Sequence, residues 1–227
     1  ALTAKALEDK GIYIGTHILN CHGVCDRHFD GKAAIDDIKK LAGVRFPVLD
    51  EKSAEVMRLE IERAAADGDS VGGILETAVI GLPEGIGEPW FDTVEGMLAH
   101  AVFSIPAVKG IGFGMGFDFV KMRGSEANDA FRYKNGKVVT ETNNNGGING
   151  GITNGMPILF RTVVKPTPSI FKKQETVDLF TKENTELELR GRHDPAIVHR
   201  ARAVVDAVTA LTICDLLAVR FGTDFLR

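Results

Sequence analysis

Asparagine and glycine dominate one short segment, whose backbone could bind an anion. Residues 143–155 hold five Asn and five Gly. These residue types adopt positive φ angles readily and can present successive N–H groups to a phosphate. The alternative is a flexible linker. Ile148 and Ile152 could anchor the segment to a core, so we favour an ordered functional loop.

A proline-rich segment comes next, with Lys165, Pro166, Thr167, Pro168 and Ser169 in succession. The two prolines restrict the backbone on either side of the threonine. The lysine offers a positive charge and the two hydroxyls offer hydrogen-bond donors, so the segment could hold a phosphate. A turn that ends a strand and exposes the lysine is an equally good interpretation.

The third segment, Arg192, His193, Asp194 and Pro195, is typical of a helix start. Asp is a preferred N-cap residue, and Pro is favoured at the first helical position. A helix N-terminus attracts anions, and the arginine adds a bidentate donor for phosphate or carboxylate. The histidine can move protons near neutral pH. Asp194 could act as a cap or in proton transfer. The three segments predict a surface for phosphorylated ligands.

Hydrophobic periodicity predicts the elements that position these segments. Strands are expected at residues 12–18, 71–82, 108–122 and 158–164, and helices at 1–9, 33–41, 53–67, 92–105 and 194–222. Ser53 and the Asp92/Glu95 pair are the expected N-terminal caps of two of these helices. Residues 81–89 form a loop, while 123–145 and 170–190 are polar excursions. Strands and helices come in separate blocks, which favours an α+β fold.

Glycines at positions 110, 112, 114 and 116 would share one face of the strand expected at 108–122. That face could admit a flat ligand or another backbone, or it could pack tightly against a helix, and both interpretations stay open. The run lacks the third glycine of a dinucleotide-binding fingerprint, and no Gly-Lys-Ser/Thr of a phosphate-binding P-loop occurs.

Composition excludes several classes of protein. The net charge of −4 argues against a general nucleic-acid binder. No apolar run approaches the ~20 residues of a membrane span. Cys21, His22, Cys25 and His28 could suggest a metal site, but a closed zinc site needs four ligands at recognisable spacing. We interpret the three cysteines, which include Cys214, as reduced thiols, and we expect no metal.

Six motifs, taken in order, resemble the chorismate synthase family. They are Gly68-Asp-Ser-Val-Gly-Gly73, the Gly/Pro-rich loop 81–89, Ile105-Pro-Ala-Val-Lys-Gly110, the Asn/Gly loop, residues 165–169 and Gly191-Arg-His-Asp-Pro195. The resemblance implies a β-α-β sandwich of the α+β class, with antiparallel sheets and helices packed between and around them. It also implies a cytoplasmic homotetramer.

The implied activity is that of a carbon–oxygen lyase. The family converts 5-enolpyruvylshikimate 3-phosphate to chorismate by 1,4-anti elimination of phosphate, the last step of the shikimate pathway in aromatic amino acid biosynthesis. The reaction needs reduced FMN without net redox change. NADPH enters only indirectly, to reduce the flavin.

The resemblance also implies the site residues. Pro106, Ala107 and Gly150 stand where the family contacts FMN, and residues 165–169 match its flavin-binding segment. Arg192 matches an arginine that contacts the flavin beside the substrate. Asp194 matches an aspartate of a proton relay around flavin N5. Arg192 and Asp194 are therefore the expected catalytic residues.

The family carries an N-terminal segment that this sequence does not match. That segment holds two functional histidines, arginines for the substrate and an Arg/Ser-rich flavin motif. We therefore expect residues 1–227 to be a single truncated domain, the C-terminal portion of such an enzyme, in which neither His17 nor His22 replaces the missing histidines. The alternative is that the chain as it stands is a non-catalytic flavin- or phosphate-binding module.

Overall fold

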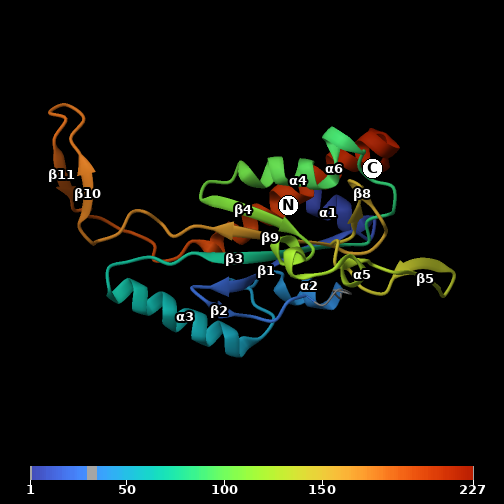
Figure 1. Ribbon diagram of the computed structural model, residues 1–227, viewed down its shortest axis with the longest axis horizontal. Helices are drawn as coiled ribbons and strands as arrows, with labels where there is room; N and C mark the ends of the chain where they lie inside the picture. The colour runs from blue at the N-terminus through green and yellow to red at the C-terminus, as the bar shows by residue number, and fades with distance from the viewer. Residues whose placement is uncertain (1, 30–34, 227) are drawn as a thin grey trace.

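A five-stranded antiparallel sheet forms the centre of the computed structural model, which describes residues 2–29 and 35–226 (Figure 1). In spatial order the strands are β2 (Val24–Cys25), β1 (Tyr13–Cys21), β3 (Gly73–Ile80), β9 (Ile158–Val164) and β4 (Val108–Phe113). The strands predicted at 12–18, 71–82 and 158–164 are confirmed as β1, β3 and β9. Their sequences are mainly apolar because strands in the middle of a covered sheet are buried on both faces.

Helices cover both faces of the sheet. The long helix α6 (Val198–Phe221) crosses one face, and α1 (Leu2–Asp9) and α4 (Val94–Phe103) pack beside it. On the opposite face α2 (Ile35–Leu41) packs on β1. The helix α3 (Glu51–Ala66) lies beside β2 at the edge of the sheet, and its Met57 belongs to the core cluster of the α6 side (Figure 1). The predicted α+β class is confirmed. Residues 33 and 34 of the helix predicted at 33–41 lie outside the described residues.

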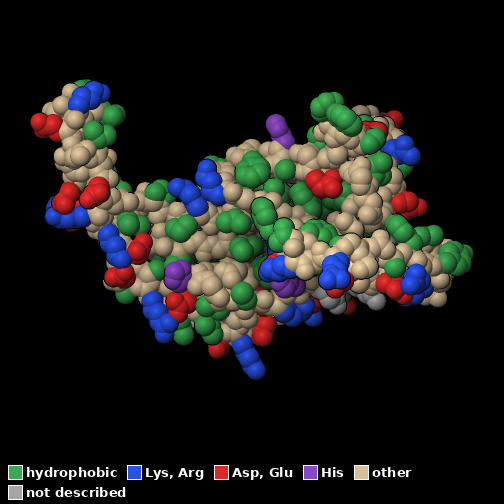
Figure 2. Space-filling model, viewed as in Figure 1, with side chains coloured by type: hydrophobic (Ala, Val, Ile, Leu, Met, Phe, Trp, Pro, Cys, Tyr) green, Lys and Arg blue, Asp and Glu red, His purple; other side chains and the backbone are tan. Residues whose placement is uncertain are grey.

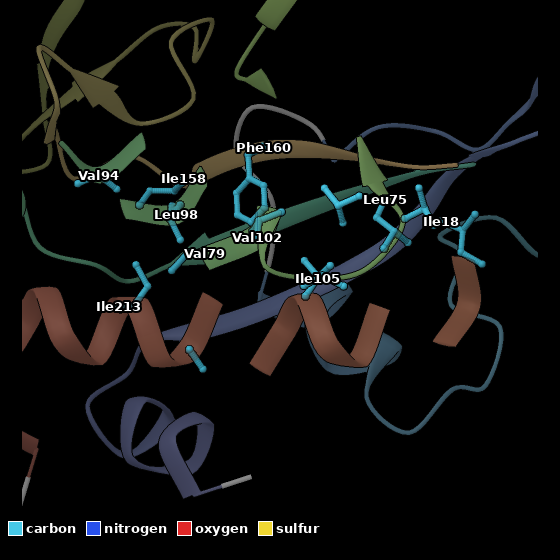
Figure 3. Close-up of a cluster of buried hydrophobic side chains, with 14 of the residues drawn as sticks. Ile18, Leu75, Val79, Val94, Leu98, Val102, Ile105, Ile158, Phe160 and Ile213 are labelled. Carbon is cyan, nitrogen blue, oxygen red and sulfur yellow. The ribbon is translucent and has the colours of Figure 1, made fainter. Parts of the chain in front are cut away.

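The main core lies between the sheet and the α4/α6 layer (Figure 3). Val94, Leu98 and Val102 of α4 are fully buried, which confirms the apolar stripe predicted for that helix. They meet Phe160 of β9 and Ile213 of α6 in one cluster. Burial of each such side chain contributes roughly 1.5–3 kcal/mol, so this layer fixes both ends of α4.

Three hairpins and four short helices complete the described chain. The hairpins pair β5 (Phe131–Lys134) with β6 (Lys137–Thr140), β7 (Ile148–Asn149) with β8 (Ile152–Thr153), and β10 (Gln174–Val177) with β11 (Asn184–Leu187). The short helices are η1 (Trp90–Asp92), η2 (Gly116–Lys121), α5 (Gly124–Ala127) and η3 (Thr223–Leu226). The β10–β11 hairpin projects from the body and carries both charged and hydrophobic side chains (Figures 1 and 2).

Two predicted N-terminal caps are wrong by one to three residues. Asp50, not Ser53, caps α3, where its carboxylate accepts the N–H two residues on. Thr93, not the Asp92/Glu95 pair, caps α4, where its hydroxyl accepts the N–H three residues on. Several cap-competent residues stand together at each start, and the helix begins after the one whose backbone is extended.

The strand predicted at 108–122 is too long. It ends at Phe113, and Gly114 and Gly116 both have positive φ angles. The Arg161 side chain on the neighbouring strand donates to the carbonyls of Gly114 and Met115 at 3.1 and 2.6 Å. These bonds hold the chain in a turn, so only Gly110 and Gly112 of the four glycines lie within the strand.

Within residues 2–29 and 35–226, no helix is both long enough and apolar enough to cross a membrane.

Candidate ligand-binding site

Two of the segments singled out in the sequence meet at one end of the sheet. Lys165, just after β9, donates its backbone N–H to the Ala107 carbonyl at 2.9 Å. Ala107 has a φ of +72°, an uncommon conformation for a residue with a side chain. Ser70 donates its hydroxyl to the Thr167 carbonyl at 2.6 Å. The Lys165 N–H therefore ties residues 165–169 to Ala107, and the loop before β3 holds the same segment through Ser70.

The same loop also holds the Arg192–Pro195 segment. Val71 donates its N–H to the Pro195 carbonyl at 2.8 Å. The His193 ring meets Phe171 edge to face, with centroids 4.8 Å apart. Phe171 is itself fixed by a backbone hydrogen bond to Gly68. Residues 106–107, 165–171 and 192–195 thus form one surface, although they are far apart in sequence.

Two buried polar atoms on this surface have no hydrogen-bond partner within the described residues. They are the Thr167 hydroxyl and Nε2 of His193. Leaving such a group unsatisfied costs about 1–3 kcal/mol, so buried polar groups normally bond to protein, water or ligand. Nearby, Lys165 and Arg192 make no side-chain hydrogen bond or ion pair with the described residues. Two unpaired polar atoms and two cations suit a phosphorylated, hydrogen-bonding ligand, and FMN has that chemistry.

Asp194 does not cap a helix, contrary to the prediction. The helix α6 begins four residues later, at Val198, and its N-cap Ile197 makes no side-chain cap bond. Asp194 instead forms an ion pair with Arg200, on the first turn of the helix. Both side chains are about half exposed, so the pair is worth little stability. The carboxylate is therefore held in place by Arg200 while it remains open to solvent or ligand.

Gly150 lies apart from this surface. It stands in the β7–β8 turn, and the neighbouring Gly151 accepts the N–H of Val94 at the start of α4. Pro106 and Ala107 follow the other end of that helix, and ten residues of α-helix span about 15 Å. A Cβ built on Gly150 would meet no atom within 4 Å. A ligand touching all these residues would have to extend along α4.

The first half of the Asn/Gly loop has no N–H groups left for a bound phosphate. The buried carboxylate of Asp129 accepts the backbone N–H groups of Asn144 and Asn145 at 2.7 and 2.8 Å. The Asn143 side chain accepts the N–H of Gly147 at 2.7 Å. The loop is ordered, and Ile148 is buried as predicted. Its donors serve the fold, however, so the predicted anion cradle is wrong at residues 144–147.

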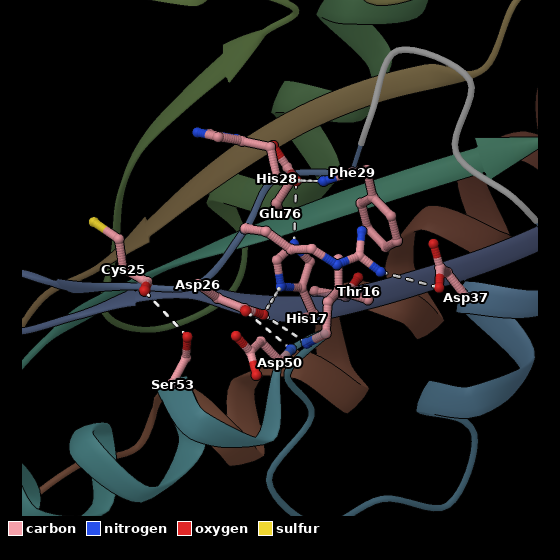
Figure 4. A network of polar contacts seen from close by, with 12 residues as sticks. Thr16, His17, Cys25, Asp26, His28, Phe29, Asp37, Asp50, Ser53 and Glu76 are labelled. Carbon is pink, nitrogen blue, oxygen red and sulfur yellow. Dashed lines mark hydrogen bonds and ion pairs between the residues drawn. The ribbon is translucent and has the colours of Figure 1, made fainter.

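A buried polar cluster on β1 and β3 escaped the sequence analysis (Figure 4). His17 lies between two carboxylates, with Nδ1 at 3.0 Å from Asp26 and Nε2 at 3.1 Å from Glu76. Glu76 also contacts Nδ1 of His28 at 2.7 Å and accepts the N–H of Phe29 at 2.6 Å. The available signal was one glutamate and one histidine, the two ionisable residues that can carry a charge near neutral pH in these mainly apolar strands.

The cluster shifts the titration of its members. Burial favours neutral Glu76, but the hydrogen bonds from His17, His28 and Phe29 outweigh burial and lower its pKa to about 2. Burial opposes the charge on His17 as well, yet the bonds to Asp26 and Glu76 raise its pKa. The cluster is thus a buried cation between two anions, which holds the outer residues 26–29 against the sheet.

The cysteines show no metal-binding arrangement. Across the described part of the chain, no three His, Cys, Asp or Glu side chains are grouped so as to hold a metal ion. Cys21, Cys25 and Cys214 are all unbridged, and burial raises the pKa of Cys21 to about 11.

Comparisons with known proteins agree on one family. The family model described as chorismate synthase matches residues 1–218. The chain is 47% identical over 218 residues to the chorismate synthase of Korarchaeum cryptofilum, covering 95% of this chain and 59% of that protein. It is 53% identical over 171 residues to that of Thermococcus gammatolerans, covering 75% of this chain and 48% of the relative.

A solved structure described as the crystal structure of chorismate synthase has the same fold. It superimposes with a TM-score of 0.81 and 26% identity, over 99% of this chain and 62% of that one. The chain therefore spans about half to three fifths of the length of the proteins that it matches.

Proposed function

This chain belongs to the chorismate synthase family, and from that premise we propose that it supplies one side of an active site that eliminates phosphate from 5-enolpyruvylshikimate 3-phosphate to give chorismate. The observation that carries the proposal is the surface of residues 106–107, 165–171 and 192–195. There the segments that match the family converge, and two buried polar atoms have no hydrogen-bond partner in the described part of the chain.

In this proposal the surface holds reduced FMN. Pro106, Ala107 and the segment 165–169 form its base, and Arg192 binds at its edge. Gly150 contacts the far end of a ligand that extends along α4. The Thr167 hydroxyl and Nε2 of His193, which have no partner among residues 2–29 and 35–226, form hydrogen bonds to it. When bound, the reduced flavin lends electron density to the substrate and takes it back, so that no net redox change occurs.

The charged side chains act on the reacting groups. Lys165 and Arg192 offset the negative charge of phosphate, and the arginine fork can make two parallel bonds to it. The elimination also releases a proton, which needs an acceptor. Asp194, positioned by Arg200, takes part in that proton transfer. Phosphate binding and proton transfer both need a side chain that the fold holds in place but that remains able to contact the ligand.

The wider setting rests on the family resemblance. We propose that the whole protein is a cytoplasmic homotetramer and that NADPH serves only to reduce the flavin. Because the chain spans about half of its relatives, the complete activity is proposed for the protein that contains it.

The direct test uses the product of the complete gene. Reduced FMN and 5-enolpyruvylshikimate 3-phosphate are added without oxygen, and chorismate is followed by its absorbance. We expect multiple turnovers with the complete protein. Failure to form chorismate would exclude the proposal. FMN binding to the 227-residue chain, measured by fluorescence quenching, should weaken at least tenfold in a Lys165→Ala, Arg192→Ala double variant.

A further inference from the structure

A cavity lies on the face of the sheet opposite α4 and α6. Its volume is about 540 Å³, and its lining includes His28, Glu76, Met115, Asp118, Leu159 and Arg161. None of these residues belongs to the surface proposed for the flavin. The cavity is larger than a site for one or two waters and lies within the usual range for small-molecule pockets.

A polar row across the sheet forms the floor of this cavity. His17 pairs in register with Glu76, Glu76 with Arg161, and Arg161 with Gly112. Directly opposed residues point to the same face of a sheet, so the three side chains stand side by side. The glycines leave room for the guanidinium, since a Cβ on Gly116 would lie 3.2 Å from its Nη2.

Glu76 does not neutralise Arg161 through a hydrogen bond. One of its oxygens contacts His28, and the other accepts from His17 and from the N–H of Phe29. The carboxylate is therefore committed to the buried cluster. His28 uses Nδ1 for its contact with Glu76, which leaves its other ring nitrogen, Nε2, outside that contact, and its side chain is 60% exposed. Among the described residues, this nitrogen has no hydrogen-bond partner.

Arg161 keeps part of its donor set uncommitted. Its Nη2 donates to the carbonyls of Gly114 and Met115. Its Nη1 lies 3.8 Å from Asp118, well beyond the 2.7–2.9 Å of a charge-assisted hydrogen bond. The nearer partner of Asp118 is Lys121, at 2.7 Å. Within the described chain, Nη1 and Nε make no hydrogen bond, although the side chain is only 24% exposed.

The rest of the cavity decides which anion could occupy it. Phe29, Met115 and Leu159 give it apolar walls. Asp118 and Glu141 also contribute to the lining, and their negative charge disfavours a dianion such as phosphate. A single carboxylate matches the planar edge of a guanidinium, and the walls suit a flat apolar body.

We propose that this cavity is a binding site for small monocarboxylates with a flat apolar body, held by Arg161 and His28 and packed on Met115. The site lies on the other face of the sheet from α4. It is independent of the proposed elimination, since it uses none of the residues assigned to that reaction.

The test uses the 227-residue chain with methyl-labelled methionine, benzoate as the probe and NMR as the readout. The chain has five methionines, so the Met115 signal can be assigned with a Met115→Leu variant. We expect benzoate to shift the Met115 signal saturably, and neutral benzamide to bind at least tenfold more weakly. Arg161→Gln should weaken benzoate binding at least tenfold, and His28→Gln about threefold or more.

Matched controls separate the site from general charge effects. Arg63→Gln and His100→Gln remove the same side-chain types from exposed helix positions, and they should leave benzoate affinity unchanged. If Arg161→Gln disturbs the turn that it holds, His28→Gln and the benzamide comparison decide the matter. An unshifted Met115 signal, equal binding of benzamide, or wild-type affinity in both cavity variants overturns the proposal. No outcome bears on the lyase proposal, because neither flavin nor turnover is measured.

Discussion

Glu76 illustrates how much one buried side chain can hold in place. Its two oxygens take hydrogen bonds from His17, His28 and the Phe29 backbone, and the residue is 5% exposed. We expect Glu76→Gln to destabilise the chain by about 3 kcal/mol, the equivalent of a pKa held at about 2 instead of 4.5. Urea denaturation at pH 7 measures this change.

The pH dependence of the stability lost in Glu76→Gln shows whether the charge of Glu76 causes that loss. A lowered carboxylate pKa contributes stability that is complete above pH 4.5 and disappears as the pH falls through about 2. The deficit of Glu76→Gln should therefore shrink over that interval. A deficit that stays constant from pH 7 to pH 3 would mean that shape and packing, rather than charge, explain the loss.

Asp194 is the residue at which the structure changes the sequence-based argument most. It was expected to cap a helix, but it pairs with Arg200. In the complete protein we expect Asp194→Asn to lower kcat at least tenfold and to change FMN affinity less than threefold, because the substitution removes a proton acceptor but no flavin anchor. Stopped-flow assays of chorismate formation and flavin titration measure the two quantities.

Arg200→Gln is the matched control for Asp194→Asn. It breaks the same ion pair but keeps the carboxylate. Turnover should fall much less in this variant. Equal loss of kcat in the two variants would show that the ion pair, and not proton transfer by Asp194, is what the reaction requires.

At the scale of elements, α4 separates the two ends of the proposed flavin surface, so its start is worth testing. We expect Thr93→Ala to cost about 1 kcal/mol, because the hydroxyl accepts the N–H of Gly96 at 2.9 Å. Thr93→Ser should keep most of that stability. Asp92→Ala should change it by less than 0.5 kcal/mol, as is usual away from such features. A larger loss at Asp92 in thermal unfolding would restore the sequence-based assignment of the cap.

The sequence predicted elements well where local pattern determines them. β1, β3 and β9 are apolar runs, and α4 has a clear helical stripe, so their positions follow from periodicity. The strand after Pro106 was placed wrongly because its end depends on Arg161, 46 and 47 residues away from the two carbonyls that it binds. Local pattern carries no information about such a contact.

Some residues of the candidate site could also be predicted from the sequence, while the contacts that bring them together could not. Lys165, Thr167 and Arg192 could be chosen from residue type and family resemblance. The contacts of Ser70 and Phe171 that join these segments could not be predicted. Ser70 binds Thr167, which is 97 residues away. Phe171 binds Gly68, and this contact depends on the fold of the loop before β3. The Asn/Gly loop misled for a related reason: Asp129, which takes its N–H groups, lies outside the glycine-rich pattern.

At the scale of the whole molecule, the two faces of the sheet respond to pH in different ways. On the α6 face, burial raises the pKa of Asp206 to about 6, although Arg202 lies 2.9 Å away. On the opposite face, hydrogen bonding overcomes burial to lower the pKa of Glu76 and Asp26 and to raise that of His17. The α6 face therefore favours the neutral form of Asp206, while the opposite face favours the charged forms of Glu76 and Asp26.

These shifts predict a stability maximum between about pH 4.5 and 6.5. Below it the lowered carboxylates gain protons, and their contribution is lost as the pH falls from 4.5 toward about 2. Above it the raised histidines lose their protons, and their contribution is lost beyond 6.5. The histidines and carboxylates share the same bonds, so their contributions must not be added twice.

Asp206 lowers stability as the pH rises through that interval, and so it moves the maximum toward the acid end. Its raised pKa contributes stability that is complete below pH 3.8 and is lost as the pH rises through about 6. We expect Asp206→Asn to stabilise the chain at pH 7.5 by up to about 3 kcal/mol, since two pKa units correspond to that free energy. The gain should vanish near pH 4. Because Arg202 keeps its hydrogen bonds to the carbonyls of Thr16 and Leu41, it does not become an isolated buried charge. Urea denaturation of both proteins from pH 4 to 8 measures the two profiles, and parallel profiles would mean that Asp206 stays ionised throughout.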